Sequence, residues 1–160
     1  GVGHLLGSSL PVGGSSTHAV LSGHSGMAGQ KMFTDLLQMK TGDIFYLHVL
    51  GETLAYEVDS LNTVLPHDTS LLGITDGSDL CTLITCTPIA VNSHRLLVTG
   101  HRIPFEAAKE MVEEAQQEDT EVESTWEQEY LRGLYIAIAV VLILFLICIV
   151  VALLGRNNDA

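Results

Sequence analysis

Residues 80–98 constrain the fold most, because two apolar runs stand on either side of a proline-containing turn. The first run is rich in β-branched side chains and ends at Cys86, and the second begins at Leu96, directly after His94 and Arg95. Runs of this length and composition are typical of strands. The pattern predicts two neighbouring strands that bring the thiol of Cys86 and the guanidinium of Arg95 together at the same end of the sheet.

A cysteine and an arginine in this arrangement suit acyl chemistry. Cysteine attacks as a thiolate, and a nearby cation both favours that form and stabilises the oxyanion of an attacked acyl group. Taken alone, Cys86 fits a buried structural cysteine better than a nucleophile, because unpaired cysteines are among the most buried side chains. Cys81 and Cys86 are five residues apart in one predicted strand, so we expect them to face opposite sides and not to form a disulfide. The third cysteine, Cys148, lies in an apolar segment near the C-terminus.

Four strings within residues 1–104 form a set: GVGHLLGSSLPVGGSSTHAVLSGHSG, GDIFYLHVLGETLAYEVDSLNTVLPHDTSLL, TLITCTP and VNSHRLLVTGHR. Together they resemble the sortases, the cysteine transpeptidases of Gram-positive cell surfaces, and within them the class C group that assembles pili. The resemblance implies an all-β fold, a sortase-type β-barrel with short helices. It also implies that the family's amino-terminal membrane segment, its lid and the first barrel strands are absent from this chain, which would leave the barrel incomplete at its N-terminus and sheet edges unpaired.

The resemblance assigns three catalytic residues. Cys86 is implied as the nucleophile, His24 as the general acid and base, and Arg95 as the cation that steadies the substrate carbonyl or its oxyanion. His24 stands in a glycine-flanked turn, and taken alone it fits an ordinary turn histidine. Members of the family usually carry arginine where Ser25 stands, so we expect one cation fewer near the groove.

The implied reaction is cleavage of a sorting signal of the Leu-Pro-X-Thr-Gly type between Thr and Gly. The fragment is held as a thioacyl enzyme and released by a lysine amine of the next pilin, so the partners are pilins or surface proteins that carry this motif. The route needs no cofactor. Two alternatives stay open: a housekeeping sortase that anchors surface proteins to the cell wall, and a non-catalytic, membrane-tethered β-domain that binds peptides.

The seven histidines raise the question of a metal site. No two of them stand at a tight ligand spacing such as His-x-x-x-His, so no metal site is predicted. His94 neighbours Arg95 in the predicted strand and therefore points to the other face, which makes it a poorer catalytic candidate than His24. The histidines are His4, His18, His24, His48, His67, His94 and His101.

The remaining part of residues 1–104 reads as short strands, turns and one helix. Spacing of apolar residues predicts a helix at 30–39, and a Gly-Glu turn at 51–52 joins two strand-like runs into a hairpin. The expected elements are a loop at 1–14, strands at 16–22, 43–50 and 53–64, and a loop at 66–78.

An acidic segment follows the predicted barrel at residues 105–133. Its part from 106 to 129 holds ten acidic residues against Lys109 and contains no Gly or Pro, which predicts a solvated helix or linker. Most of the net charge of −12 therefore belongs to this segment. Such a charge argues against a nucleic-acid partner, which clustered Lys and Arg would hold.

Twenty residues without a charge run from Tyr135 to Leu154. At about 1.5 Å per helical residue they span the hydrocarbon core of a bilayer. We therefore expect a transmembrane helix at 134–155 and a short cytoplasmic tail at 156–160. The resemblance places residues 1–133 on the extracellular face of the cell membrane, because pilus sortases often carry such a carboxy-terminal anchor.

Overall fold

The structure is a computed structural model that describes residues 1–27, 29–116 and 129–142. Chain contacts divide the protein into two compact units, Gly1–Val112 and Glu113–Ala160. The first unit contains the strands, and the second contains helical residues 129–142.

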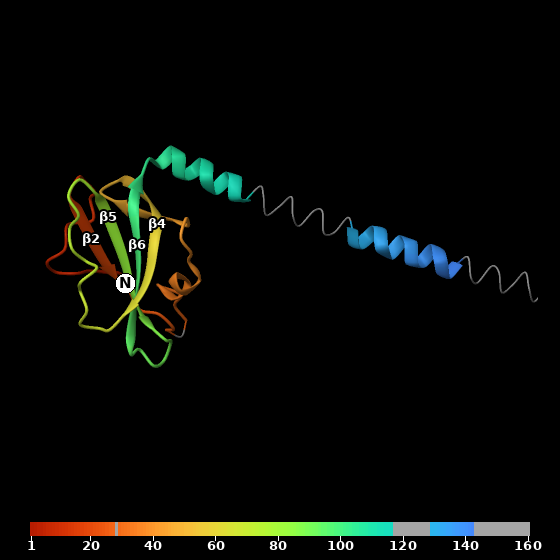
Figure 1. The fold of residues 1–160 in the computed structure, drawn as a ribbon, viewed down its shortest axis with the longest axis horizontal. Helices are drawn as coiled ribbons and strands as arrows, with labels where there is room; N and C mark the ends of the chain where they lie inside the picture. The colour runs from red at the N-terminus through yellow and green to blue at the C-terminus, as the bar shows by residue number, and fades with distance from the viewer. Residues whose placement is uncertain (28, 117–128, 143–160) are drawn as a thin grey trace, which may run out of the picture. The chain divides into compact units, whose positions relative to one another are not determined.

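Six strands form one sheet in the order β1-β2-β5-β6-β4-β3 (Figure 1). β2 runs parallel to β5, and the other neighbours are antiparallel. In the part of the chain that the structure describes, β1 and β3 are the edges of the sheet, which is therefore open. The predicted all-β fold is confirmed as a curled sheet. The elements are β1 (Gly3–His4), β2 (Thr17–Ser22), the 3-10 helix η1 (Thr34–Gln38), β3 (Ile44–Val49), β4 (Glu52–Val64), β5 (Asp79–Thr87) and β6 (His94–Ile103).

The predicted hairpin forms as β3 and β4, but its turn lies one residue before the predicted Gly-Glu turn at 51–52, because Glu52 already pairs with Val49 as the first residue of β4. Leu50 and Gly51 connect the strands with φ angles of 51° and 84°. Two successive positive φ angles match the right-handed twist of a two-residue hairpin, and glycine adopts such an angle without steric cost. The predicted strand pair on either side of residues 88–93 is likewise present as β5 and β6.

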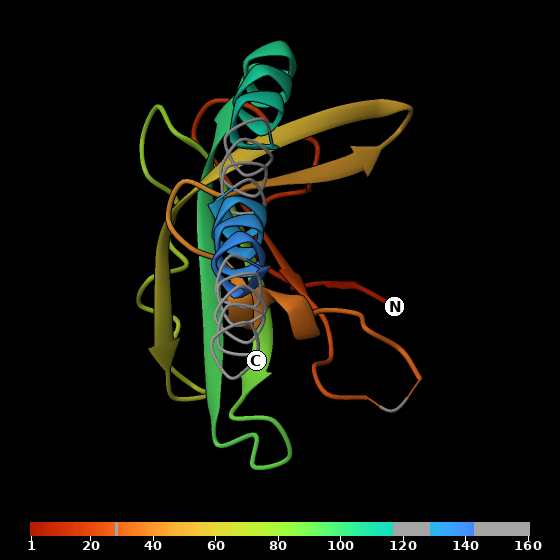
Figure 2. The ribbon, with the colours of Figure 1, turned by 90° about the vertical axis from the view of Figure 1, so that its right-hand side faces the viewer.

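β4 bends where its register against β6 shifts between Val58 and Ser60. Figure 2 shows this strand turning away from the hairpin toward the other end of the sheet. Gly100 lies opposite the bulge, where a Cβ atom would come within 2.5 Å of the Glu57 carbonyl oxygen. The extra residue and the glycine together let the sheet curl.

The main core covers one face of the sheet. Phe45 stacks on Tyr56 with ring centroids 5.4 Å apart, and Tyr56 donates a hydrogen bond of 3.0 Å to Asp79. Burial and the neighbouring Asp79 charge raise the pKa of this phenol. The buried members of the core are Ala19, Leu36, Phe45, Leu54, Tyr56, Val58, Cys81, Leu83, Leu96 and Val98.

The helix predicted at residues 30–39 is wrong in length. Only Thr34–Gln38 is helical, and it is a 3-10 helix. Met32 adopts a positive φ of 39°, and Met39 is extended with ψ of 152°, so the backbone leaves helical geometry on both sides. Phe33 at the N-cap provides no side-chain hydrogen bond to the first turn. Leu36 is the one buried residue of this 3-10 helix, so only part of the packing that the apolar spacing predicts is present.

Residues 105–116 are helical, in agreement with the predicted acidic helix over that part. Ala108 is fully buried against Ala55 and Ile103, and Phe105 meets the Tyr46 ring edge-on at 6.0 Å. Among the described residues, no helix is long and apolar enough to cross a membrane. Residues 117–128 of the predicted linker, residues 143–155 of the predicted transmembrane helix, and the predicted tail at 156–160 lie outside the described residues.

Candidate active site

Three neighbouring strands bring the predicted site residues together. Cys86, near the end of β5, is the direct cross-strand partner of Arg95 near the start of β6. Ser22 pairs with Ile84 in the parallel ladder of β2 and β5. Because parallel strands end at the same edge of a sheet, His24, two residues beyond Ser22, arrives beside the cysteine.

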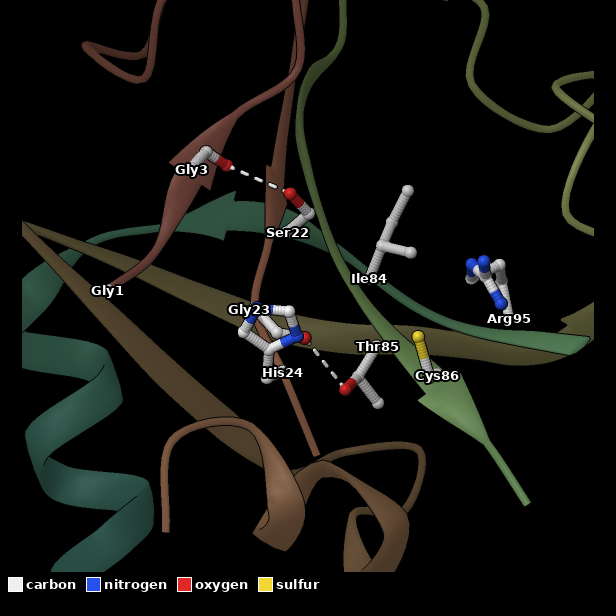
Figure 3. Close-up of a pocket in the computed structure, with 9 residues that line it drawn as sticks. All are labelled: Gly1, Gly3, Ser22, Gly23, His24, Ile84, Thr85, Cys86 and Arg95. Carbon is white, nitrogen blue, oxygen red and sulfur yellow. Dashed lines mark hydrogen bonds between the residues drawn. The ribbon is translucent and has the colours of Figure 1, made fainter. Parts of the chain in front are cut away.

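A cavity of about 340 Å³ opens at this edge. In Figure 3 the Cys86 sulfur is seen between the His24 imidazole and the Arg95 guanidinium. The structure therefore brings all three predicted site residues to one cavity, from the turn after β2, from β5 and from β6. The lining residues are Gly1, Gly3, Ser22, Gly23, His24, Ile84, Thr85, Cys86 and Arg95.

Three hydrogen bonds hold the His24 turn against the cysteine strand. The Gly23 amide donates to the Ile84 carbonyl at 3.0 Å, and the Thr85 hydroxyl donates to the Gly23 carbonyl at 2.9 Å. The Ser25 hydroxyl donates to the carbonyl of Cys86 itself at 2.6 Å. We call these three bonds the clamp. It fixes the backbone on both sides of the histidine relative to the thiol.

Arg95 is held at the turn between β5 and β6. Its Nη1 donates to the carbonyls of Asn92 at 3.0 Å and His94 at 2.9 Å. A guanidinium carries five N–H donors in a fixed planar fork. Because Nη1 is hydrogen-bonded to the turn, the backbone orients the whole Arg95 guanidinium, and the side chain lines the cavity. This arrangement suits the guanidinium to bind an oxygen that gains negative charge.

The comparisons with known proteins agree with this geometry. The profile of the sortase domain matches residues 1–103. The chain belongs to the sortase family. Sortase C-1 from Actinomyces oris is 59% identical over 65% of this chain and 59% of its own, with a TM-score of 0.63. The pilus-related sortase C of group B Streptococcus is 51% identical over 66% of this chain and 54% of its own, with a TM-score of 0.64.

A curated relative, Sortase A from Bacillus anthracis, is 32% identical over 89 residues, which are 56% of this chain and 42% of that protein. This chain thus spans about half the length of the sortases it matches. Both of these solved structures are sortases C, and the group B Streptococcus protein is a pilus-related one, in agreement with the class that the sequence resembles.

The two cysteines of β5 differ sharply in this sortase. Cys81 is completely buried in the core, whereas Cys86 is partly exposed in the cavity, so they do face opposite sides of the strand. Burial, and next the Asp79 charge, raise the pKa of the Cys81 thiol to about 12. A thiol that resists ionisation is a poor nucleophile. Cys148 lies outside the described residues.

The other histidines have structural partners or lie away from the cavity. His94 bonds to Ser93, His101 lies 2.7 Å from Asp59, and His48 bonds to Thr53. Within residues 1–27, 29–116 and 129–142, no group of three or more His, Cys, Asp or Glu residues could hold a metal ion.

Sequence reasoning missed the residues that position this site. Thr85 and Ser25 form the clamp, and His18 is buried in β2 with both ring nitrogens bonded. Thr85 stands next to the cysteine and Ser25 next to the histidine, which is the signal that could have drawn attention to them. The run THAVL places His18 inside an apolar strand, but its partners are distant in sequence.

Proposed function

We propose that this sortase is a cysteine transpeptidase that cleaves a Leu-Pro-X-Thr-Gly sorting signal and transfers the acyl part to a lysine amine of a pilin. The observation that carries the proposal is the single cavity lined by His24, Cys86 and Arg95 in a chain of this family. A nucleophile, a proton carrier and a fixed cation at one site are what acyl transfer requires.

In the first half-reaction, the Cys86 sulfur attacks the threonine carbonyl carbon as a thiolate. The carbonyl electrons move onto oxygen, and the Arg95 guanidinium stabilises that oxyanion. When the tetrahedral intermediate collapses, the bond to the glycine nitrogen breaks, and His24 gives the departing amine its proton. The product is a thioester between Cys86 and the threonine.

In the second half-reaction, a lysine amine attacks the thioester carbon. His24 accepts the proton that the amine loses, the new amide bond forms, and the Cys86 thiolate leaves. The products are an isopeptide bond and the original enzyme. A pilin as acceptor is supported by the similarity to the pilus-related sortase C of group B Streptococcus and to a sortase C of Streptococcus pneumoniae with specificity for pilin substrates.

The membrane attachment is part of the same proposal. Twenty residues without a charge, from Tyr135 to Leu154, match the thickness of a bilayer core. A carboxy-terminal anchor would hold the catalytic unit at the extracellular face of the cell membrane, where exported substrates emerge.

The experiment that tests the proposal offers two acceptors to the full chain with a Leu-Pro-X-Thr-Gly peptide. One acceptor is a pilin fragment with its lysine, and the other is a glycine-type amine that mimics a cell-wall precursor. We expect a peptide–pilin conjugate joined through lysine and no conjugate from Cys86→Ala. Transfer to the wall-type amine alone would instead favour the housekeeping function. Peptide binding without cleavage would favour the non-catalytic domain.

A further inference from the structure

His18 lies on the same sheet face as the active site, at its other end. The β2 residues His18, Val20 and Ser22 alternate toward this face, as do the β5 residues Thr82, Ile84 and Cys86. His18 is 1% exposed, although histidine is usually only partly buried. A buried polar ring has to be hydrogen-bonded on both nitrogens to avoid a large free-energy cost.

Both His18 nitrogens have partners. Nδ1 donates to the carbonyl of Gly73 at 2.8 Å, since a carbonyl only accepts. Nε2 lies 2.7 Å from the Thr82 hydroxyl, which lies 2.8 Å from the Thr99 hydroxyl on β6. With its proton on Nδ1, the neutral ring accepts the Thr82 proton at Nε2. The side chains of His18, Thr82 and Thr99, which we call the polar cluster, therefore join three strands to one loop.

That loop, residues 65–78 between β4 and β5, has little else to hold its middle. None of its residues is buried, and Leu71 and Ile74 are large apolar side chains left exposed. Its first half bonds mainly within itself, as in the Asp68–Ser70 contacts. The end of the loop, just before β5, is hydrogen-bonded to Ser16 and Thr17 at the start of β2. The hydrogen bond from His18 to the Gly73 carbonyl reaches the loop between these two parts.

The loop forms a wall of a second cavity of about 210 Å³, which we call the side cavity. Leu72, next to the tethered Gly73, lines it together with Pro66, Asp68 and Thr69. The rest of its lining includes Ser22, Ile84 and Arg95, which also line the active-site cavity. A peptide that reached Cys86 past Arg95 would therefore pass beside the loop to which His18 is hydrogen-bonded.

We propose that His18 is a positioning residue: by holding Gly73 it fixes the loop wall of the side cavity and thereby sets the affinity for the peptide substrate. This inference rests on the proposed function for its substrate, a peptide with a sorting signal. His18 lines neither the active-site cavity nor the side cavity, so its effect belongs to binding and not to the chemical steps.

Two isosteric variants separate the two bonds of the ring. An asparagine amide can place its N–H where Nδ1 stands, whereas a glutamine amide reaches the position of Nε2. His18→Asn therefore keeps the tether to Gly73, and His18→Gln keeps the contact with Thr82. Tyr56→Phe is the matched control, because it removes a buried hydrogen bond to Asp79 on the opposite, core face.

The experiment measures kcat and KM of the full chain for a Leu-Pro-X-Thr-Gly peptide, and hydrogen exchange of the amides at residues 72–74. For His18→Gln we expect KM to rise about tenfold with kcat within about twofold, and exchange at 72–74 to accelerate. His18→Asn and Tyr56→Phe should keep KM and the exchange rates near the parent values, and we expect thermal melting to find each variant less stable than the parent.

Equal KM and exchange in His18→Gln and His18→Asn, or a similar KM rise in Tyr56→Phe, would overturn the inference. If the parent chain turns over no peptide, the proposed function fails separately. The hydrogen exchange of residues 72–74 is then the only test. Faster exchange in His18→Gln but not in His18→Asn supports the bond from His18 to Gly73 as the tether of the loop, and equal exchange rates overturn it.

Discussion

At the scale of single residues, Arg95 gains its role from two backbone carbonyls. Those of Asn92 and His94 bind one nitrogen and orient the fork, which neither a flexible side chain nor a bare charge would achieve. Orientation is what makes a donor useful to a transition state, because no reorganisation is needed when charge develops.

Replacing Arg95 tests this orientation. We expect Arg95→Ala to lower kcat of peptide cleavage by about 10²–10³-fold, the usual effect of losing an oxyanion donor. Arg95→Lys should recover only a small part of that loss, because an ammonium keeps the charge but not the fork. Full recovery by lysine, measured by peptide turnover, would show that charge alone matters.

Cys81 gives this sortase a pH-dependent stability. The pKa of the Cys81 thiol in the folded protein, about 12, lies above its ordinary value of 9.0. The contribution of this thiol to the free energy of unfolding is therefore complete below pH 9 and is lost as pH rises toward 12. The loss is at most about 1.4 kcal/mol per pH unit from this one group.

Urea unfolding at pH 8, 9, 10 and 11 measures the effect. Cys81→Ala should begin less stable, because it leaves a small cavity, but should lose stability less steeply than the parent above pH 9. Tyr56, whose pKa is raised mainly by burial and by Asp79, titrates in both proteins, and Cys81 is the smallest of the causes that raise its pKa. Parallel pH profiles for the two proteins would contradict the assignment.

At the scale of elements, the clamp explains how two strands far apart in sequence present one site. The Ser25–Cys86 bond joins residues 61 apart, and the Thr85–Gly23 bond joins residues 62 apart. Gly23 is also packed on the Phe33 ring, which a Cβ would approach to 2.8 Å. The turn that carries His24 is therefore pinned from both the strand side and the core side.

The clamp predicts a specific loss of activity. Ser25→Ala and Thr85→Val should each cost about 1 kcal/mol of folding free energy and lower kcat by about tenfold or more, because a misplaced base transfers protons poorly. Thr53→Val is the control, since it removes a side-chain hydrogen bond to His48 on the distant hairpin. If the control variant loses as much kcat as the clamp variants at equal stability, the clamp has no positioning role.

The sequence predicts elements better than it predicts contacts between them. Strands appear as apolar runs, and the hairpin follows from local turn chemistry, although its turn lies at 50–51 and not at the predicted 51–52. The helix at 30–39 was overestimated, because apolar spacing does not register the positive φ at Met32. The bond from His18 to Gly73 spans 55 residues, and no short-range pattern encodes it.

At the scale of the whole molecule, the candidate site was predictable through family resemblance, whereas residue types alone were not enough. Cys86 and Arg95 fall in adjacent predicted strands, but His24 is placed by a parallel pairing of β2 with β5 that alternating apolar residues cannot reveal. The positioning groups depend on that pairing, so they become visible only in the folded chain.

The proposed membrane anchor belongs to this scale as well. We expect the full chain to float with phosphatidylglycerol vesicles in a density gradient, and a chain ending at residue 133 to stay at the bottom. The double variant Ile138→Lys with Val141→Lys is the matched control of full length. It should also stay at the bottom, because each charge near the centre of a membrane span costs about 3 kcal/mol. Flotation of the shortened chain would place membrane binding elsewhere.

The central claim is that Cys86 forms a thioester with a sorting signal. Intact mass measurement of the purified full chain after incubation with a Leu-Pro-X-Thr-Gly peptide tests it most directly, with Cys86→Ala alongside and circular dichroism to verify folding. We predict that the parent gains the mass of the peptide's acyl fragment up to threonine, and that Cys86→Ala gains nothing. A folded parent without the adduct, or an equal adduct on Cys86→Ala, would contradict the account.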